Sequence, residues 1–198
     1  MKSKKNFAYR LAKTIRVLSV PPVMVTALIL ILYRQDRLIF RNPSDVVVPI
    51  VFLGFVPVLA YPLQHLIPAL RQNGRETQRK LAFLLNMIGY TLALIWAVSN
   101  PVSPQMLLLC LTYFFSVVLL TLCNKALHVH ASGHACSVTG PLLLLIYLVD
   151  WTLIFPCIAS GLFIAWSSLY LKRHTAKELL TGSLVCLVSF AAALLCLT

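Results

Sequence analysis

Long runs of apolar residues, separated by short polar links, dominate the chain. A helix that crosses a bilayer needs about 20 mostly apolar residues, because the hydrocarbon layer is about 30 Å thick. Seven runs have roughly this length, and they cover residues 17–33, 46–67, 81–99, 105–123, 132–149, 152–171 and 178–197. The pattern therefore predicts an all-α fold, a polytopic membrane helix bundle with six or seven transmembrane helices.

Prolines leave the number of spans open between six and seven. The run 46–67 contains three prolines, so we expect a kinked or partly re-entrant segment there. Two prolines stand near the start of the run 17–33, which is expected either to cross the membrane or to lie partly in its interface.

Composition agrees with a membrane protein. Hydrophobic residues make up 60% of the 198 residues and charged residues only 11%, whereas a soluble domain has roughly a quarter of its residues charged. The length suits one membrane domain, 1–198, with a basic N-terminal arm, 1–16. The six cysteines have no metal spacing and lie in or beside apolar runs, so we expect them to be small buried hydrophobes.

The charge is strongly basic, with 17 Lys and Arg against 5 Asp and Glu. The bases are confined to short links between apolar runs, which favours contact with anionic lipid headgroups and argues against a nucleic-acid partner. A cytoplasmic N-terminus would put the arm 1–16, the loop 71–80, Lys125 and the link 172–177 on the cytoplasmic side. We therefore expect an integral protein of a prokaryotic inner membrane.

Ionisable residues gather in two of these links, which the topology places on the same side of the membrane. Charged and titratable side chains at the membrane are costly and mark function. A pocket rich in histidine and base suits phosphate binding with acid–base chemistry. Its expected members are His128, His130, His134 and Lys125 in the first link and Lys172, Arg173, His174 and Glu178 in the second.

Two short segments have the right residues for this chemistry. Ser132 can cap a helix, and Gly133 lets the backbone approach a ligand, so the free N–H groups can receive an oxyanion. His174 and Glu178 are four residues apart and share a helix face. A carboxylate that accepts one imidazole N–H fixes the tautomer, and the other nitrogen becomes a better nucleophile.

These segments resemble two motifs of the type-2 phosphatidic-acid phosphatase superfamily, which includes the vanadium haloperoxidases. Ala131-Ser132-Gly133-His134 is similar to its Pro-Ser-Gly-His motif. The segment 167–178 resembles its third motif, which reads Ser-Arg, five residues, His, three residues, Asp, and Gly182 follows one turn later. The stretch 134–141 is similar to a prokaryotic branch with a Ser-Gly-His-Ala-x-Gly-x-x-Gly-Pro pattern. The resemblance covers about the last 80 residues.

The resemblance implies a catalytic core in the helices of 105–197 and a phosphohistidine mechanism without metal or cofactor. His174 would be the nucleophile, His134 would protonate the leaving oxygen, and Glu178 would hold His174. The substrate would be a lipid phosphate or diphosphate from the bilayer, such as phosphatidic acid, phosphatidylglycerol phosphate or a polyprenyl phosphate or diphosphate. The residues expected to bind its phosphate are Lys125, Ser132, Gly133, Arg173 and His130.

The chain departs from the family pattern at several points. Ser168 stands where the family has arginine, and Glu178 replaces aspartate. Lys125 lacks the Arg-Pro that completes the family's first motif, and His130 stands where the branch often has lysine. The bases that could replace the lost arginine are Arg173, Lys172, Arg75 and Arg79.

Three alternatives remain open. Thr175-x-x-Glu178 is a capping box, which gives Glu178 a purely structural role. The loss of arginine at Ser168 favours a non-catalytic lipid transporter or scaffold on the same fold. A metal-dependent membrane enzyme is the third alternative. Its ligands would be His128, His130, His134 and His174.

Overall fold

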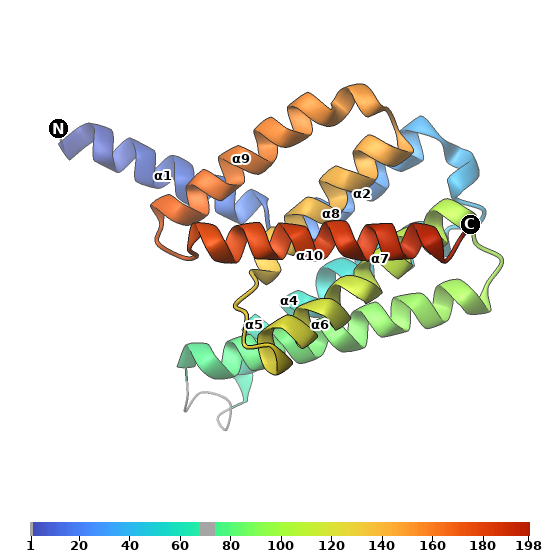
Figure 1. Ribbon diagram of the computed structural model, residues 1–198, viewed down its shortest axis with the longest axis horizontal. Helices are drawn as coiled ribbons and strands as arrows, with labels where there is room; N and C mark the ends of the chain where they lie inside the picture. The colour runs from blue at the N-terminus through green and yellow to red at the C-terminus, as the bar shows by residue number, and fades with distance from the viewer. Residues whose placement is uncertain (1, 68–73) are drawn as a thin grey trace.

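The computed structural model describes residues 2–67 and 74–198, and these residues form helices and short links without a strand (Figure 1). The predicted all-α fold is therefore confirmed. The α-helices are α1 (Lys2–Leu18), α2 (Pro21–Gln35), α3 (Ser44–Pro49), α4 (Val56–Val58), α5 (Ala60–Leu66), α6 (Gly74–Ser99), α7 (Pro104–Thr121), α8 (Gly133–Leu148), α9 (Ile154–Tyr170) and α10 (Ala176–Leu195). The 3₁₀- and π-helical turns are η1 (Arg37–Ile39), η2 (Ile50–Phe55), η4 (Leu122–Ala126) and η5 (Trp151–Leu153).

Within the described chain, four helical segments are long and apolar enough to cross a membrane. Two bent pairs, α1 with α2 and α3–α4 with α5, raise the number to six if each pair is one span. These helices mark an integral membrane protein with four to six candidate spans. The one predicted run that is not among these candidates is the fifth, 132–149, and it corresponds to α8, whose 16 residues make a helix only about 24 Å long. The four spans are Lys80–Ser99, Pro104–Ala126, Trp151–Tyr170 and Ala176–Leu195.

Prolines bend the chain where the sequence indicates. The run 46–67 divides into α3, the π-helical η2, α4 and α5, with a bend of 43° before α5, so the expected kink is confirmed. The basic arm forms α1, which meets α2 at 62°. Val20 precedes Pro21 and adopts φ −70° and ψ 150°, because proline excludes the helical conformation from the residue before it.

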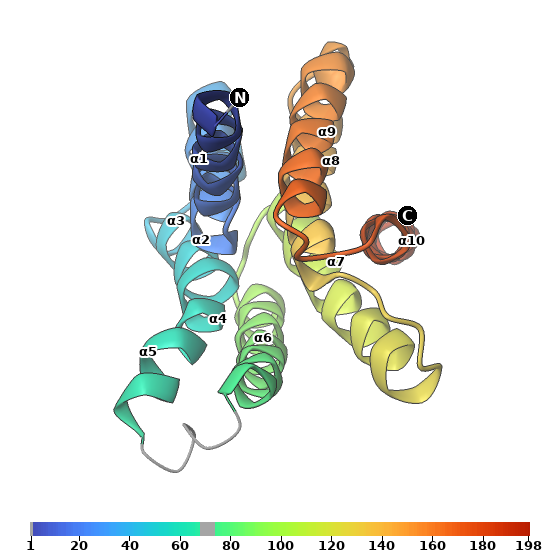
Figure 2. The same cartoon turned by 90° about the vertical axis from the view of Figure 1, so that its left-hand side faces the viewer.

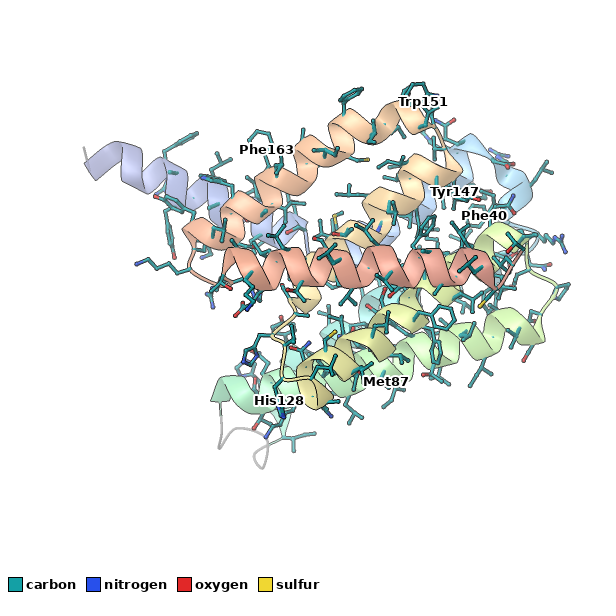
Figure 3. The ribbon with its side chains drawn as sticks, viewed as in Figure 1. Phe40, Met87, His128, Tyr147, Trp151 and Phe163 are labelled. Carbon is teal, nitrogen blue, oxygen red and sulfur yellow. The ribbon has the colours of Figure 1, made fainter. Side chains whose placement is uncertain are left out.

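The core lies along α7, which packs against α6 and α10, while α8 contacts α2, α9 and α10. Figure 2 looks along the bundle and shows α1 and α2 on one side and α8 and α9 on the other. The side chains of Leu109, Val117 and Leu144 are buried at its centre. Large apolar side chains on α9 remain exposed, among them Phe163 (Figure 3). Such a surface suits lipid contact.

Three of the five acidic residues cap turns away from the candidate site. A carboxylate that accepts backbone N–H groups satisfies donors that the start of a helix leaves unpaired. Asp36 accepts from Leu38 N–H at 2.9 Å, Asp45 from Arg41 N–H at 2.7 Å and Asn42 N–H at 3.2 Å, and Asp150 from Thr152 N–H at 2.7 Å. These acids therefore have local structural roles.

A close approach joins the first turns of α10 to the start of α8. Gly182 lies against Ser132, so that a Cβ on Gly182 would collide with the Ser132 carbonyl oxygen. The N–H of Ser132 donates to the carbonyl oxygen of Glu178 at 3.0 Å. Residue 182 must therefore be small for α8 and α10 to meet in this way.

We expect Gly182→Ala to destabilise the protein by about 1–3 kcal/mol, since the added methyl group forces the two helices apart. The measurement is the midpoint of thermal unfolding in detergent. Gly161→Ala is the matched control, because a Cβ there meets Leu142 at an ordinary 3.6 Å. Equal unfolding midpoints for the two variants would contradict the importance of this contact.

Candidate active site

The two sequence motifs meet at the end of the bundle where α8 and α10 begin (Figures 1 and 2). His134 lies in the first turn of α8, and His174 lies in the link between α9 and α10. Their ring centroids are 6.5 Å apart, and the ring planes are nearly parallel, at 9°. The structure therefore places side by side the two imidazoles expected to act as nucleophile and acid.

A carboxylate orients one of these rings. Nδ1 of His174 lies 3.1 Å from Oε2 of Glu178. An ionised carboxylate can only accept hydrogen bonds, so Nδ1 donates and Nε2 keeps its lone pair. Glu178 also accepts from the N–H of Thr175 at 3.3 Å, and Thr175 Oγ1 accepts from the N–H of Glu178 at 3.2 Å. Capping and histidine orientation thus occur together at Glu178.

The start of α8 offers backbone donors. The hydroxyl of Ser132 is buried and accepts from the N–H of Ala135 at 3.2 Å, so it acts as the helix cap. The carbonyl of Ser132 accepts from the N–H of Cys136. Neither bond uses the N–H groups of Gly133 and His134. Gly133 is exposed, and a Cβ there would meet no atom within 4 Å. An anion at this helix start would therefore meet backbone N–H groups, and the Ser132 oxygen can accept as the cap while its O–H still donates to the anion.

Asn124 fixes the segment that leads into this helix, and the sequence analysis did not single it out. Its Oδ1 accepts from the N–H of Ala131 at 3.1 Å. Its Nδ2 donates to the carbonyls of Ala131, at 3.2 Å, and Leu120, at 2.9 Å. The signal in the sequence is only an asparagine seven residues before an Ala-Ser-Gly-His string, and such a residue is common in links.

The N-terminal helix reaches both motifs, and this too was absent from the sequence analysis. A guanidinium N–H of Arg16 donates to Oγ of Ser168 at 3.2 Å, across 152 residues of chain. Oγ of Ser19 lies 3.3 Å from Nε2 of His134 and donates to the carbonyl of Arg16 at 3.2 Å. The only sequence signal for this contact is the helical spacing of the residues on one face of α1, where Ala12 is buried.

Positive charge is concentrated beside His134. Arg16 is a charged neighbour of His134, and His174 adds positive charge there when it is protonated, while Glu178 binds His174 on the other side. An anion placed between the two imidazoles would meet charges of opposite sign from more than one direction. The arrangement is therefore suited to binding a phosphoryl group.

The structure describes the side chains of three of the other bases predicted for the site, and all three are exposed. Lys125 lies exposed in η4, and Arg173 and Lys172 lie exposed in the link after α9. Among the described residues, no hydrogen bond or ion pair connects Lys125 or Arg173 to either histidine. Two further bases named from the sequence have side chains outside the described residues, and these are Arg75 and Arg79.

The histidines of the first link differ in their exposure to solvent. His128 and His130 are exposed, and His128 lies on the link beyond α7 (Figure 3). His130 is close enough to Glu178 to act on it electrostatically. Within the described chain, no group of three or more His, Cys, Asp or Glu side chains is arranged to hold a metal ion. The geometry of these residues thus gives the metal-site alternative no support.

Aromatic side chains mark where the site lies relative to the lipid. Trp151 stands at one end of the span that contains α9, and Trp166 and Tyr170 pack together at the other, with ring centroids 5.4 Å apart. Tryptophan and tyrosine are enriched where a helix leaves the hydrocarbon layer. The link with His174 follows Tyr170, so we expect this link to lie at the membrane interface.

Comparisons of the chain with protein-family models, curated proteins and solved structures find no match. Function is therefore inferred from the resemblance of two motifs and from the geometry of these side chains.

We expect Asn124→Ala to loosen the segment before α8, because the side chain holds both backbone groups of Ala131. The loss of two such hydrogen bonds should raise amide exchange of residues 131–133 by about tenfold. The measurement is hydrogen–deuterium exchange with mass spectrometry in detergent. Asn100→Ala removes an exposed bond to the Trp96 carbonyl and is the control. Unchanged exchange in Asn124→Ala would refute the anchoring role.

Proposed function

We propose that this protein hydrolyses a phosphate monoester or diphosphate on a membrane lipid, through a phosphohistidine intermediate. The observation that supports this most is the pair of facing imidazoles, one of them held by a carboxylate, at the membrane interface. The resemblance to the type-2 phosphatidic-acid phosphatases supports the same reaction, since His134, His174 and Glu178 stand at its motif positions.

The separation of the two rings suits transfer of one phosphoryl group. A reacting atom approaches its nucleophile to about 3–3.5 Å before bond formation. The ring centroids of His134 and His174 are 6.5 Å apart, a separation at which nitrogens of both rings can reach one phosphoryl group. Both imidazoles can therefore act on the same group.

The proposed reaction has two steps. Nε2 of His174 attacks phosphorus, the bond from phosphorus to the lipid oxygen breaks, and that oxygen takes a proton from His134. Water then gives a proton to His134 and attacks phosphorus, the bond to His174 breaks, and inorganic phosphate leaves. Glu178 accepts from Nδ1–H throughout, so it stabilises the positive charge that His174 gains in the first step.

The hydrogen bond of Ser19 is consistent with a proton on His134. The Ser19 hydroxyl donates its single hydrogen to the Arg16 carbonyl, so it accepts at its contact with His134. Nε2 of His134 then carries a hydrogen, but only the imidazolium form can give it to the leaving oxygen. Burial and the charges of Arg16 and His174 lower the pKa of His134, so this form requires the negative charge of a bound phosphate, which raises that pKa.

The surroundings favour an anionic lipid as the substrate. The exposed basic residues around the site produce a positive electrostatic potential, which attracts an anionic headgroup. The free backbone donors of Gly133 and His134 suit a phosphoryl oxygen at a helix start. Phosphatidic acid, phosphatidylglycerol phosphate and polyprenyl phosphates or diphosphates all have this chemistry. The proposed setting is the cytoplasmic side of a prokaryotic inner membrane.

A non-catalytic lipid transporter or scaffold is the second candidate. The observation that favours it is Ser168, a fully buried residue at the position where the phosphatase motif has arginine. A protein that binds lipid phosphate without hydrolysis would keep the basic surface and lose turnover.

We expect the purified protein in detergent to release phosphate from at least one of these lipids, with and without a metal chelator. His174→Ala should lower the rate by at least about a thousandfold, because it removes the nucleophile. The measurement is inorganic phosphate released over time. His65→Ala, a histidine outside the site, is the control. Release that survives in His174→Ala would refute the mechanism, and no release from any lipid would favour the transporter or scaffold.

Two substitutions separate the catalytic role of Glu178 from its capping role. Glutamine at 178 keeps a capping box and loses the charge, so Glu178→Gln should keep the unfolding midpoint and lower phosphate release by about 10²- to 10⁴-fold. Thr175→Ala should cost about 1 kcal/mol of stability and retain release. If both variants instead lose phosphate release to the same extent as they lose stability, Glu178 has a structural role only.

A further inference from the structure

We propose that Arg16, from the N-terminal helix, supplies the phosphate-binding guanidinium that the third motif lacks at residue 168. This inference rests on the proposed function, because it names a further residue of the same site. It makes α1 part of the anion site, although the motif resemblance covers only the C-terminal part of the chain.

The position of Arg16 is the first argument. Ser168 lies in the last turns of α9, six residues before His174, where the motif places its arginine. The guanidinium of Arg16 donates to the hydroxyl of Ser168 at 3.2 Å. The charge therefore arrives beside the expected residue, carried by a different helix.

The small size of residue 168 is the second argument. Ser168 is completely buried, and α1 packs against α9 at this place. The half-buried side chain of Arg16 lies over a residue with a short side chain. A long side chain at 168 would compete with Arg16 for the same space, so serine at 168 and arginine at 16 fit together.

The attachment of α1 to the second motif is the third argument. Ser19, one turn after Arg16, contacts Nε2 of His134 at 3.3 Å. The last turn of α1 and the residue that follows the helix thus touch the third motif and the second. The charge of Arg16 also acts on His134, so it extends into the region between the imidazoles where phosphoryl oxygens would gather.

The chemistry of the guanidinium is the fourth argument. Arginine has five N–H donors in a planar fork and binds phosphate through two parallel hydrogen bonds. The bond to the Ser168 hydroxyl engages one of these donors, and a phosphoryl group can compete for others through its charge. The bases that the sequence suggested for this role include Arg173 and Lys172, which lie exposed in the link after α9.

The test is binding of orthovanadate, a mimic of the phosphoryl group in transfer, to the purified full-length protein in detergent. Titration calorimetry gives its dissociation constant, and phosphate release from the lipid panel is measured in parallel. We expect Arg16→Ala to weaken vanadate binding by about 10- to 100-fold, since a charge-assisted hydrogen bond is lost. The vanadate affinity of Arg16→Lys should lie between those of the wild type and Arg16→Ala, because lysine provides a point charge without the planar fork of donors.

A matched control and a relocated charge sharpen the test. Arg10→Ala removes one positive charge from an exposed position of the same helix and should leave binding unchanged. The double variant Arg16→Ser with Ser168→Arg returns the guanidinium to the motif position and should recover most of the lost affinity. A purely structural role of Arg16 would not produce this recovery.

Each outcome decides between the two proposals. Wild-type vanadate affinity in folded Arg16→Ala would overturn the role of Arg16, and lipid phosphate release by the wild type would still support the proposed function. Vanadate binding that depends on Arg16, without release from any lipid, would support the anion site and refute hydrolysis. If Arg16→Ala does not fold, Arg16→Gln, which keeps a donor for Ser168, replaces it, and wild-type affinity there overturns the inference.

Discussion

The candidate site depends on the contact between the first turns of α10 and the start of α8. The absence of a side chain at Gly182 lets α10 lie on the backbone of Ser132, and the Ser132 N–H donates to the carbonyl of Glu178. Because α8 carries one imidazole and the link before α10 carries the other, this backbone contact sets the separation of the rings. The side-chain pair of His174 and Glu178 is local, and the pairing between helices depends on backbone atoms.

Two kinds of constraint meet at this end of the bundle. The proline after Val20 ends α1 and turns the chain by 62° into α2, which leaves the C-terminal turn of α1 free to pack on α9. Most acidic residues have a different task, since Asp36, Asp45 and Asp150 cap turns elsewhere. The site end therefore keeps a large excess of positive charge, with Glu178 beside His174, and phosphate is a ligand of complementary charge.

Local sequence patterns predicted the helices, the proline bends and the approach of His174 to Glu178, because each depends on residues within a turn or two of one another. The helix cap at Ser132 was predicted and is confirmed, while the contact of its hydroxyl with phosphate stays a prediction. The contact of Arg16 with Ser168 spans 152 residues, and no spacing rule links such positions. Asn124 acts through the backbone of Ala131, so its side chain has no motif of its own. The roles assigned to His134, His174 and Glu178 stay predictions.

The short length of α8 has a consequence for the bilayer itself. Its 16 residues span about 24 Å, whereas the hydrocarbon layer is about 30 Å thick. If the turn at Trp151 is anchored at the far interface, the first turn of α8 lies roughly 6 Å below the near one. Lipid beside α8 must then thin locally, or water and headgroups must sink toward His134. Hydrophobic mismatch at this short helix would thus bring a lipid headgroup closer to the imidazoles. In a thicker membrane the headgroup would have to move further into the bilayer, at a higher free-energy cost.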